Sequence, residues 1–383
     1  MRSAGDVLQL IRDGRASSRT DLVRLTGLSR TAVVARVSAL ADAGLVTSAD
    51  ELASTGGRPA AGLAFNGAAG VVLAAAIGRS RSQLGVFDLA GGELAASSLD
   101  HEVGAPPDVV MPAAAAGLRD LLAARGVEAG RVLGIGVSLP GTVDPVRALA
   151  IDSPAMAGWD GVDLAAALAD ASSAPVHAGN DADVLARSER LGRAAGFADL
   201  LVVKASTGLG LGIIADGRVV TGHLGAAGEI GHTKVDDAAG LACRCGDTGC
   251  LETLAGGWAL VGRLREAGHD VGHVRDLVAL AQHGDAEAKA LLRESGRRLG
   301  EVLAVALNLL NPQAVVVGGD MAAAFDVFTA GVRESVYARA TALATRDLRF
   351  LPATFGDRAG LVGCAAMALD HALSPEAVDA RLA

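Results

Sequence analysis

Apolar residues recur at helical spacing in the N-terminal part of the chain. Residues 4–12 predict a short helix. Ser18 and Ser29 are placed to cap the starts of two further helices through their side chains. Gly27 lies in the tight turn between these two helices, and a pair of extended segments begins at Leu45. The order of helix, helix, turn, helix and two-stranded wing is that of a winged helix-turn-helix.

Beyond this wing, short apolar runs alternate with helical stretches. The runs at 71–77, 132–137 and 200–204 predict buried strands, residues 83–98 predict a hairpin, and a long helix is expected over 285–308. Glycine-rich or polar turns follow several of the strands, and open sheets bind their ligands at such strand ends. The pattern therefore predicts an α/β body whose ligand site lies at strand ends.

The charge of the chain is uneven. The formal net charge is −9, but residues 1–60 hold eight Arg against six Asp and Glu, so this part carries +2 and the remainder −11. This balance argues against a general polyanion binder and permits a nucleic-acid-binding head. The sequence shows no apolar leader and no run long enough to span a membrane, so we expect a cytoplasmic protein without a membrane partner.

The third predicted helix carries suitable side chains for reading DNA on its first turn. Ser29, Arg30 and Thr31 occupy that turn, and Arg36 lies about two turns further on. Arg58, in a glycine-containing linker, suits an arm that enters the minor groove. These residues predict contacts with operator DNA. The alternative is a three-helix appendage used for dimerisation or as a substrate lid.

Three of the four cysteines lie within eight residues, in a C-x-C-x4-C array downstream of His232. Cys243, Cys245, Cys250 and His232 offer three thiolates and one imidazole, which is a tetrahedral ligand set for Zn²⁺. Because protein ligands fill all four positions, the predicted zinc ion is structural. Cys364 stands apart in a predicted helix, and we expect it to lie in the core.

The body contains four motifs with distinctive residues at fixed spacing. They are Gly179-Asn-Asp181, Ser206-Thr-Gly-Leu-Gly-Leu-Gly212, Glu229-Ile-Gly-His232 and Cys243-Arg-Cys-Gly-Asp-Thr-Gly-Cys250-Leu-Glu252. These motifs resemble signatures of the ROK family (repressors, open reading frames, kinases), and the whole chain resembles its repressor branch, which includes xylose-type regulators. The resemblance implies a two-lobed, actin-like body of the kind found in sugar kinases, with a ribonuclease H-like fold.

The resemblance also implies the domain boundaries. We expect a winged helix-turn-helix DNA-binding domain at 1–62, and a small α/β lobe at 63–180 that is joined by a C-terminal helix at 360–383. A large α/β lobe with the zinc and sugar motifs is expected at 181–359. A homodimer or homotetramer is expected, because winged helices of this size usually read paired half-sites.

The resemblance assigns roles to several residues of these motifs. In family kinases the residue matching Asp181 is the general base that takes the proton from the hydroxyl being phosphorylated, and here it could equally be a hydroxyl acceptor. Asp183, two residues further on, is expected to lie in solvent. The residues expected to bind a sugar are Asn180, Asp181, Glu229, His232 and Glu252.

The nucleotide-binding half departs from the family pattern. Family kinases open the body with Asp-x-Gly-Gly-Thr, whereas this chain has Ala76 in place of the carboxylate and Arg79 in place of the second glycine. Without the carboxylate at position 76, a hard cation loses a ligand. The side chain of Arg79 crowds the approach of the backbone to a phosphate. The second phosphate loop and the adenosine-side turn survive, in vestigial form, as Thr207, Gly208, Gly210, Gly318 and Gly319.

These observations together predict a repressor that binds operator DNA through its head and a sugar effector in its body. The alternative is an ATP-dependent ROK sugar kinase of the glucokinase type with an appended DNA-binding head. A third reading is a catalytically inactive scaffold that does not bind DNA. Ala76 and Arg79 argue against an active kinase, and the arginine-bearing head argues against the scaffold.

Overall fold

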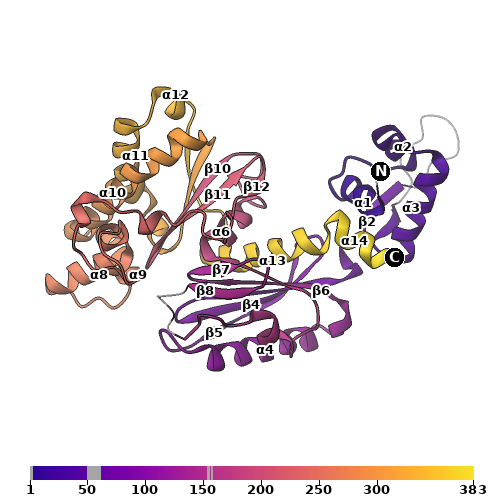
Figure 1. Cartoon of the computed structure of the whole chain (residues 1–383), viewed down its shortest axis with the longest axis horizontal. Helices are drawn as coiled ribbons and strands as arrows, with labels where there is room; N and C mark the ends of the chain where they lie inside the picture. The colour runs from indigo at the N-terminus through magenta and orange to yellow at the C-terminus, as the bar shows by residue number, and fades with distance from the viewer. Residues whose placement is uncertain (1–2, 50–61, 153–155, 157) are drawn as a thin grey trace.

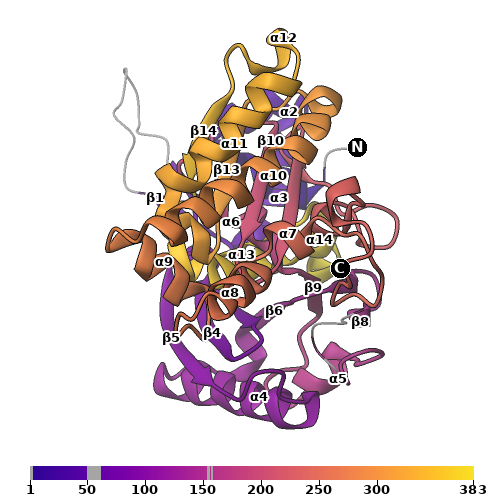
Figure 2. The ribbon, with the colours of Figure 1, turned by 90° about the vertical axis from the view of Figure 1, so that its left-hand side faces the viewer.

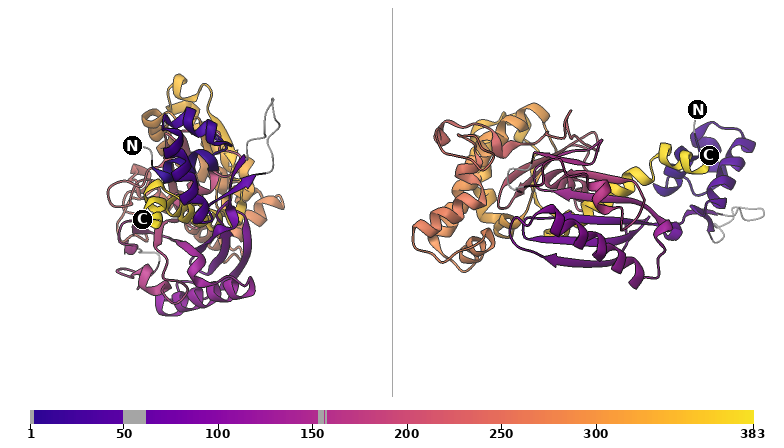
Figure 3. Two further views of the ribbon diagram at one scale, coloured as in Figure 1. Left: turned by 90° about the vertical axis from the view of Figure 1, so that its right-hand side faces the viewer. Right: turned by 60° about the horizontal axis from the view of Figure 1, so that its bottom comes forward.

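The computed structural model describes residues 3–49, 62–152, 156 and 158–383, and it has a small N-terminal head at one end of a two-part body (Figures 1 and 3). The head has the predicted order of helices and paired strands, with Val46 opposite Phe65. Arg58 lies outside the described residues. The elements of the head are α1 (Ala4–Arg12), α2 (Arg19–Thr26), α3 (Arg30–Asp42), β1 (Val46–Ala49) and β2 (Gly62–Phe65).

Side-chain caps begin each helix of the head. Ser18 and Ser29 each accept a hydrogen bond from a backbone amide in the first turn of the following helix, as predicted. Gly27 ends α2 in the left-handed conformation, with φ of 71°. The reciprocal capping box between Ser3 and Asp6 at α1 was not predicted.

The first unit of the body is a five-stranded sheet in the order β5-β4-β3-β6-β9. Successive side chains of β3 point to opposite faces, so Leu73 and Ala75 pack in the core with α4 whereas Val72 and Ala74 pack in the core with α13. A short hairpin of β7 and β8 and the helix α5 complete this unit. Its elements are β3 (Val71–Ile77), β4 (Arg81–Asp88), β5 (Glu93–Asp100), α4 (Pro107–Ala124), β6 (Val132–Leu139), β7 (Thr142–Asp144), β8 (Leu149–Asp152), α5 (Leu164–Leu168) and β9 (Val176–Asn180).

The second unit has a sheet in the order β12-β11-β10-β13-β14. Leu201 and Val203 of β10 face the core of α8–α11, whereas Leu200 and Val202 face α6. The helices α8–α11 thus cover the outer face of this sheet (Figures 1 and 2). Its elements are α6 (Asp181–Glu189), β10 (Leu200–Ala205), β11 (Leu209–Ala215), β12 (Arg218–Val219), α7 (Glu252–Ala255), α8 (Gly257–Glu266), α9 (Val274–Gln282), α10 (Ala286–Leu310), β13 (Ala314–Gly318), α11 (Phe325–Arg339), α12 (Ala342–Thr345) and β14 (Arg349–Pro352).

The two sheets have the same topology. In each, three antiparallel strands are followed by two strands that run parallel to the first of them. The two-lobed α/β fold predicted from the sequence is confirmed. Helices α6 and α13 pack against each other so closely that a Cβ on Gly363 would lie 1.9 Å from the carbonyl oxygen of Val184.

The C-terminal helices connect the body with the head. Helix α13 (Ala359–Ala372) packs on the first sheet, and α14 (Pro375–Leu382) packs against α1, so the two ends of the chain lie close together (Figures 1 and 3). Of the predicted segment 360–383, the first helix therefore packs on the small lobe and the second on the head. No described helix is long and apolar enough to cross a membrane.

Candidate functional site

A cavity of about 760 Å³ opens between the two units of the body. Its walls come from the β3–β4 turn, the loop after β6, the start of α6 and the β10–β11 turn. All five residues predicted to bind sugar line this cavity, and so do all five predicted to contact a nucleotide. The folded chain thus brings together motifs that lie more than 200 residues apart, from Ala76 to Gly319.

Asp181 begins α6, and its carboxylate pairs with Lys204 on β10, with 2.8 Å between Oδ2 and Nζ. Burial opposes the charge on Lys204, but the attraction of Asp181 outweighs this effect and raises the pKa of Lys204 above its ordinary value. Lys204 therefore neutralises the carboxylate that was predicted as a general base. Lys204 was not predicted as a site residue, although its place at the end of a predicted strand and before a glycine-rich turn was a usable signal.

Asn180 is hydrogen-bonded through both ends of its amide group. Its Nδ2 donates to the carbonyl oxygen of Gly141 at 2.7 Å, and its Oδ1 accepts from the backbone amide of Ala182 at 2.7 Å. Asn180 thus caps α6 and fastens the loop after β6 to the helix start. Its side chain holds the cavity wall in place, and its contact with a sugar stays a prediction.

Glu229 and His232 lie on a short turn that borders the cavity. The Nε2 atom of His232 is 3.9 Å from Oε2 of Glu229, while Nδ1 on the other side of the ring is 3.7 Å from Sγ of Cys243. One imidazole therefore faces the predicted sugar site with one nitrogen and the cysteine cluster with the other. This arrangement connects the two predicted sites through a single side chain.

Glu252 is buried, with 7% of its surface exposed, and supports the neighbouring glycine-rich turn. One carboxylate oxygen accepts from the backbone amide of Leu209 at 2.9 Å, and the other from Nε1 of Trp258 at 2.9 Å. Each oxygen can accept a second hydrogen bond, so a sugar contact stays compatible with this geometry. This positioning role of Glu252 was not predicted from the sequence.

Packing alone requires glycine at several positions of the vestigial nucleotide loops. A Cβ on Gly208 would lie 2.7 Å from the carboxylate of Glu252, and one on Gly210 would lie 2.9 Å from Cβ of Ala182. Gly319 has φ of 86°, and its Cβ would lie 2.5 Å from a backbone oxygen of β10. These glycines are explained by close approach of the chain, and their contact with a nucleotide stays a prediction.

Two arginines face the cavity beside these loops. Arg79 lies on the β3–β4 turn, where its Nε is buried without a hydrogen-bond partner among the described residues. Arg244 stacks on Trp258, with 4.7 Å from its guanidinium carbon to the ring centre. Burial, and then the positive charge of Arg79, lowers the pKa of Arg244. From the sequence, Arg79 was predicted only to crowd the approach to a phosphate, and Arg244 was not predicted as a site residue.

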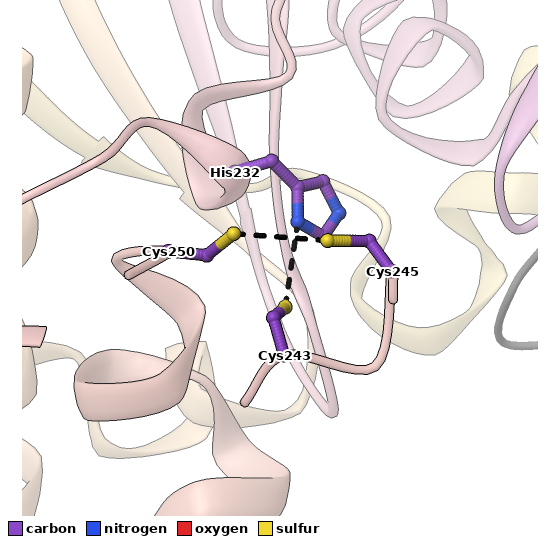
Figure 4. Close-up of side chains that lie close together, drawn as sticks. All are labelled: His232, Cys243, Cys245 and Cys250. Carbon is purple, nitrogen blue, oxygen red and sulfur yellow. Dashed lines mark hydrogen bonds between the residues drawn. The ribbon is translucent and has the colours of Figure 1, made fainter. Parts of the chain in front are cut away.

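The four predicted metal ligands form one cluster, shown in Figure 4. One ligand atom from each of His232, Cys243, Cys245 and Cys250 lies within 4.8 Å of the other three. The Sγ atoms of Cys245 and Cys250 are 3.7 Å apart. A tetrahedron with metal–sulfur bonds of about 2.3 Å has edges of roughly 3.8 Å, so this spacing fits a bound zinc ion. The four residues could hold a metal ion.

Lys234 stands next to this cluster. Its Nζ donates to Sγ of Cys250 at 3.2 Å and pairs with the carboxylate of Asp247 at 2.6 Å. Lys234 thus connects one predicted metal ligand with an acidic side chain of the same loop. Cys364, by contrast, is fully buried in the core, as predicted.

The expected solvent position of Asp183 is wrong. Asp183 lies on α6 with 3% of its surface exposed, because α6 is packed between the second sheet and α13. Residues two positions apart in a helix point to different faces. Because Asp181 lines the cavity, Asp183 points away from the cavity into the protein.

The predicted DNA-contacting residues lie on the first turns of α3. Ser29, Arg30 and Thr31 are exposed. Ser29 also caps the helix by accepting from the amide of Ala32 at 3.2 Å, and Arg36 is half-buried and donates to the carbonyl oxygen of Ala32 at 3.1 Å. The exposed turn is available to a partner, and its contact with DNA stays a prediction.

Comparison with known proteins identifies the family of the chain. The ROK family model matches residues 72–371, which is most of the chain. The chain belongs to the ROK family. Among its ROK relatives, the xylose repressor of Bacillus subtilis strain 168 is 26% identical over 357 residues, covering 93% of this chain and 92% of the repressor.

Solved ROK structures agree with this assignment. A ROK family transcriptional regulator, described as a homologue of the E. coli MLC protein, superimposes with a TM-score of 0.84 and 27% identity, covering 99% of this chain and 98% of the regulator. A ROK glucokinase from Streptomyces griseus, in complex with glucose and AMPPNP, gives a TM-score of 0.64 and 28% identity, covering 78% of this chain and 99% of the kinase. The kinase thus matches less of this ROK protein than the regulator does.

Proposed function

We propose that this ROK protein is a sugar-responsive transcriptional regulator that represses genes for carbohydrate uptake or catabolism. One observation carries the proposal: the similarity to the transcriptional regulator extends over 99% of the chain, whereas the glucokinase matches 78%. The similarity to a xylose repressor likewise covers 93% of the chain. The predicted boundaries, with a DNA-binding head at 1–62 and body lobes at 63–180 and 181–359, belong to this proposal.

The head supplies the proposed DNA contact. Arg30 and Thr31 are exposed on the first turn of α3, the end of a recognition helix that enters the major groove. An arginine there can bind guanine through two hydrogen bonds or pair with a phosphate. We propose operator DNA as the partner of this surface, read by a homodimer or homotetramer with one head for each half-site.

The body supplies the proposed sugar site. Asp181, Glu229 and Glu252 line one cavity and offer charged acceptors to vicinal hydroxyls, and Asn180 and His232 border the same space. Hydrogen bonds to charged groups contribute about 1.5–3 kcal/mol each, so a few of them suffice for specific binding.

DNA binding is tested with full-length protein. Duplexes selected from a random pool are used in gel shifts with and without sugars. We expect Arg30→Ala to weaken binding by about 1–3 kcal/mol, because one base contact is lost. Arg125→Ala is the matched control, since Arg125 is an exposed arginine at the end of α4. Failure to select any duplex, or equal affinities for Arg30→Ala and wild type, would contradict the assignment.

We propose that His232, Cys243, Cys245 and Cys250 hold one structural Zn²⁺. A cation at this point would cross-link two loops and supply no open coordination position for chemistry. Since His232 also faces Glu229, the ion would fix the orientation of the sugar-site wall.

Metal analysis tests the zinc proposal. We expect about one zinc per chain in purified protein, and Cys245→Ser to lose the metal, lower the melting temperature and weaken sugar binding. Cys364→Ala is the control, because this cysteine lies in the core away from the cluster and should leave the zinc content unchanged. If protein purified without chelators contained no zinc, this result would contradict the zinc proposal.

A further inference from the structure

The three clustered cysteines differ in how easily a small molecule can reach their sulfur atoms. Cys243 and Cys250 are buried, with 7% and 0% of their surfaces exposed. Cys245 is only half-buried, and it lines the cavity between the two units of the body. A reagent that enters the cavity therefore meets the sulfur of Cys245 before it can meet the other two.

The sulfur of Cys250 lies within reach of Cys245. The two Sγ atoms face each other at 3.7 Å (Figure 4), so a disulfide bond of about 2.05 Å requires an approach of about 1.7 Å. Residues 246–249 form the loop between the two cysteines. No described atom lies within 4 Å of the place that a Cβ on Gly246 would occupy, so the loop has room to adjust.

Cys243 is a less suitable partner for Cys245. Only Arg244 separates the two cysteines, so a disulfide between them would close a small ring with strained geometry. The sulfur of Cys243 instead faces the imidazole of His232, 3.7 Å from Nδ1. The geometry therefore favours Cys245 and Cys250 as the pair that can form a disulfide.

We propose that Cys245 and Cys250 are a site of reversible oxidation by hydroperoxides. The thiolate of Cys245 attacks one oxygen of hydrogen peroxide, so that an S–O bond forms, the O–O bond breaks and hydroxide leaves. The thiolate of Cys250 then attacks the sulfur of this sulfenic acid, which forms the disulfide and releases a second hydroxide. The peroxide thus accepts the two electrons that the sulfurs lose, and an external dithiol restores both thiols by exchange.

Oxidation at this site removes two of the four proposed zinc ligands. A disulfide offers no thiolate to a metal ion, so only His232 and Cys243 remain as ligands. His232 also lies 3.9 Å from Glu229 through its other ring nitrogen, and loss of the cluster loosens the turn that carries both residues. This second part of the inference rests on the proposed function: the oxidised protein binds its sugar effector more weakly.

Mass spectrometry of full-length protein treated with hydrogen peroxide tests the oxidation site. We expect the free thiols to fall from four to two, a cross-linked peptide to join Cys245 to Cys250, and dithiothreitol to restore all four thiols. Cys250→Ser should stop the reaction at the sulfenic acid, which dimedone traps on Cys245. Cys364→Ala is the matched control and should form the same disulfide, because Cys364 lies fully buried in the core.

A further variant and a binding measurement separate this site from the zinc and regulator proposals. His232→Ala removes the imidazole and keeps the three thiols, so it should form the disulfide at least as fast as wild type, whether or not a metal is bound. Calorimetry with glucose, xylose and N-acetylglucosamine compares reduced and oxidised wild type. We expect oxidation to weaken sugar binding about tenfold, as for the loss of one hydrogen bond to a charged group.

The outcomes decide each part of the inference. Four free thiols after treatment with excess peroxide, or a disulfide that contains Cys243, overturn the oxidation site. A disulfide between Cys245 and Cys250 that leaves sugar affinity unchanged overturns the link to the effector. If the reduced protein binds no sugar, the regulator proposal fails, and the peptide map of wild type still decides the oxidation site. That map needs no variant, so it holds even where Cys250→Ser does not fold.

Discussion

At the scale of single residues, Asp183 shows how burial changes the chemistry of a side chain. Burial raises the pKa of Asp183 to about 7; Arg187 opposes this, and Asp181 and Glu229 reinforce it. Below pH 4 the carboxyl is protonated in both the folded and the unfolded chain. Between pH 4 and 7 only the unfolded chain loses the proton, so this residue makes stability fall as pH rises, with no further change above about pH 7.

We therefore expect Asp183→Asn to stabilise the protein more at high pH than at low pH. The difference in free energy of unfolding between variant and wild type should grow by about 2 kcal/mol from pH 5.5 to pH 8, since one pKa unit corresponds to about 1.4 kcal/mol. Urea unfolding at the two pH values measures it, and the subtraction cancels other titrating groups. A difference that is constant with pH would show that Asp183 is ionised in the folded protein.

At the scale of elements, the C-terminal helices connect the cavity with the head. Helix α6 starts at Asp181 in the cavity wall and binds α13 through Arg187 and Asp370, which are 3.2 Å apart. Helix α14 follows, and its Asp379 accepts a hydrogen bond from the amide of Gly5 in the first turn of α1 at 2.8 Å. The head core also continues into α13 and α14 without interruption. A shift of α6 on effector binding would therefore reach the DNA-binding head through packed helices.

We expect Asp379→Ala to reduce the coupling between effector and DNA. The change leaves a free amide at the positive end of α1 and loosens α14 against the head. The ratio of DNA affinities with and without effector should fall toward one, while effector affinity stays within about twofold because Asp379 does not line the cavity. Gel shifts and calorimetry give the two numbers.

Two controls refine this experiment on α14. Asp379→Asn keeps the acceptor and should keep most of the coupling, and Glu376→Ala removes an exposed acid of the same helix and should change nothing. Full coupling in Asp379→Ala would mean that the signal reaches the head by another route.

At the scale of the whole molecule, the two lobes enclose a cavity that resembles the active site of a sugar kinase but lacks groups needed for phosphoryl transfer. Phosphoryl transfer depends on positioning and neutralising the γ-phosphate, with Mg²⁺ at the centre. Ala76 removes an acid from this site, Arg79 fills the approach, and Lys204 holds the carboxylate of Asp181. These features argue against phosphoryl transfer in this cavity.

We expect binding without turnover. A coupled ADP-release assay with ATP, Mg²⁺ and a panel of hexoses, pentoses and N-acetylated amino sugars should give no significant rate, while calorimetry detects binding of at least one of these sugars. Asp181→Asn should weaken that binding, since a charged acceptor becomes neutral. Turnover of about 1–100 s⁻¹, as in kinases, would support the alternative of a sugar kinase with an appended head.

Local patterns of the sequence predicted much of the fold. The caps at Ser18 and Ser29, the alternating strands and the long α10 depend on contacts between near neighbours, so they were predictable. The metal cluster was predictable for a similar reason. Cysteine and histidine are recognisable as metal ligands, and three of the four ligands lie within eight residues of each other. The burial of Asp183 was not, because it depends on α13, which lies about 180 residues further on.

The sequence by itself determined the family, the two-lobed architecture, the ligand motifs and the loss of the first phosphate motif, because residue types at fixed spacing carry each of them. Only the tertiary structure decided which side chains meet across the cavity. It paired Lys204 with Asp181, placed Arg244 over the ring of Trp258, and joined α14 to α1. Charge pairing and burial depend on distances between residues far apart in the chain, and the folded chain alone sets those distances.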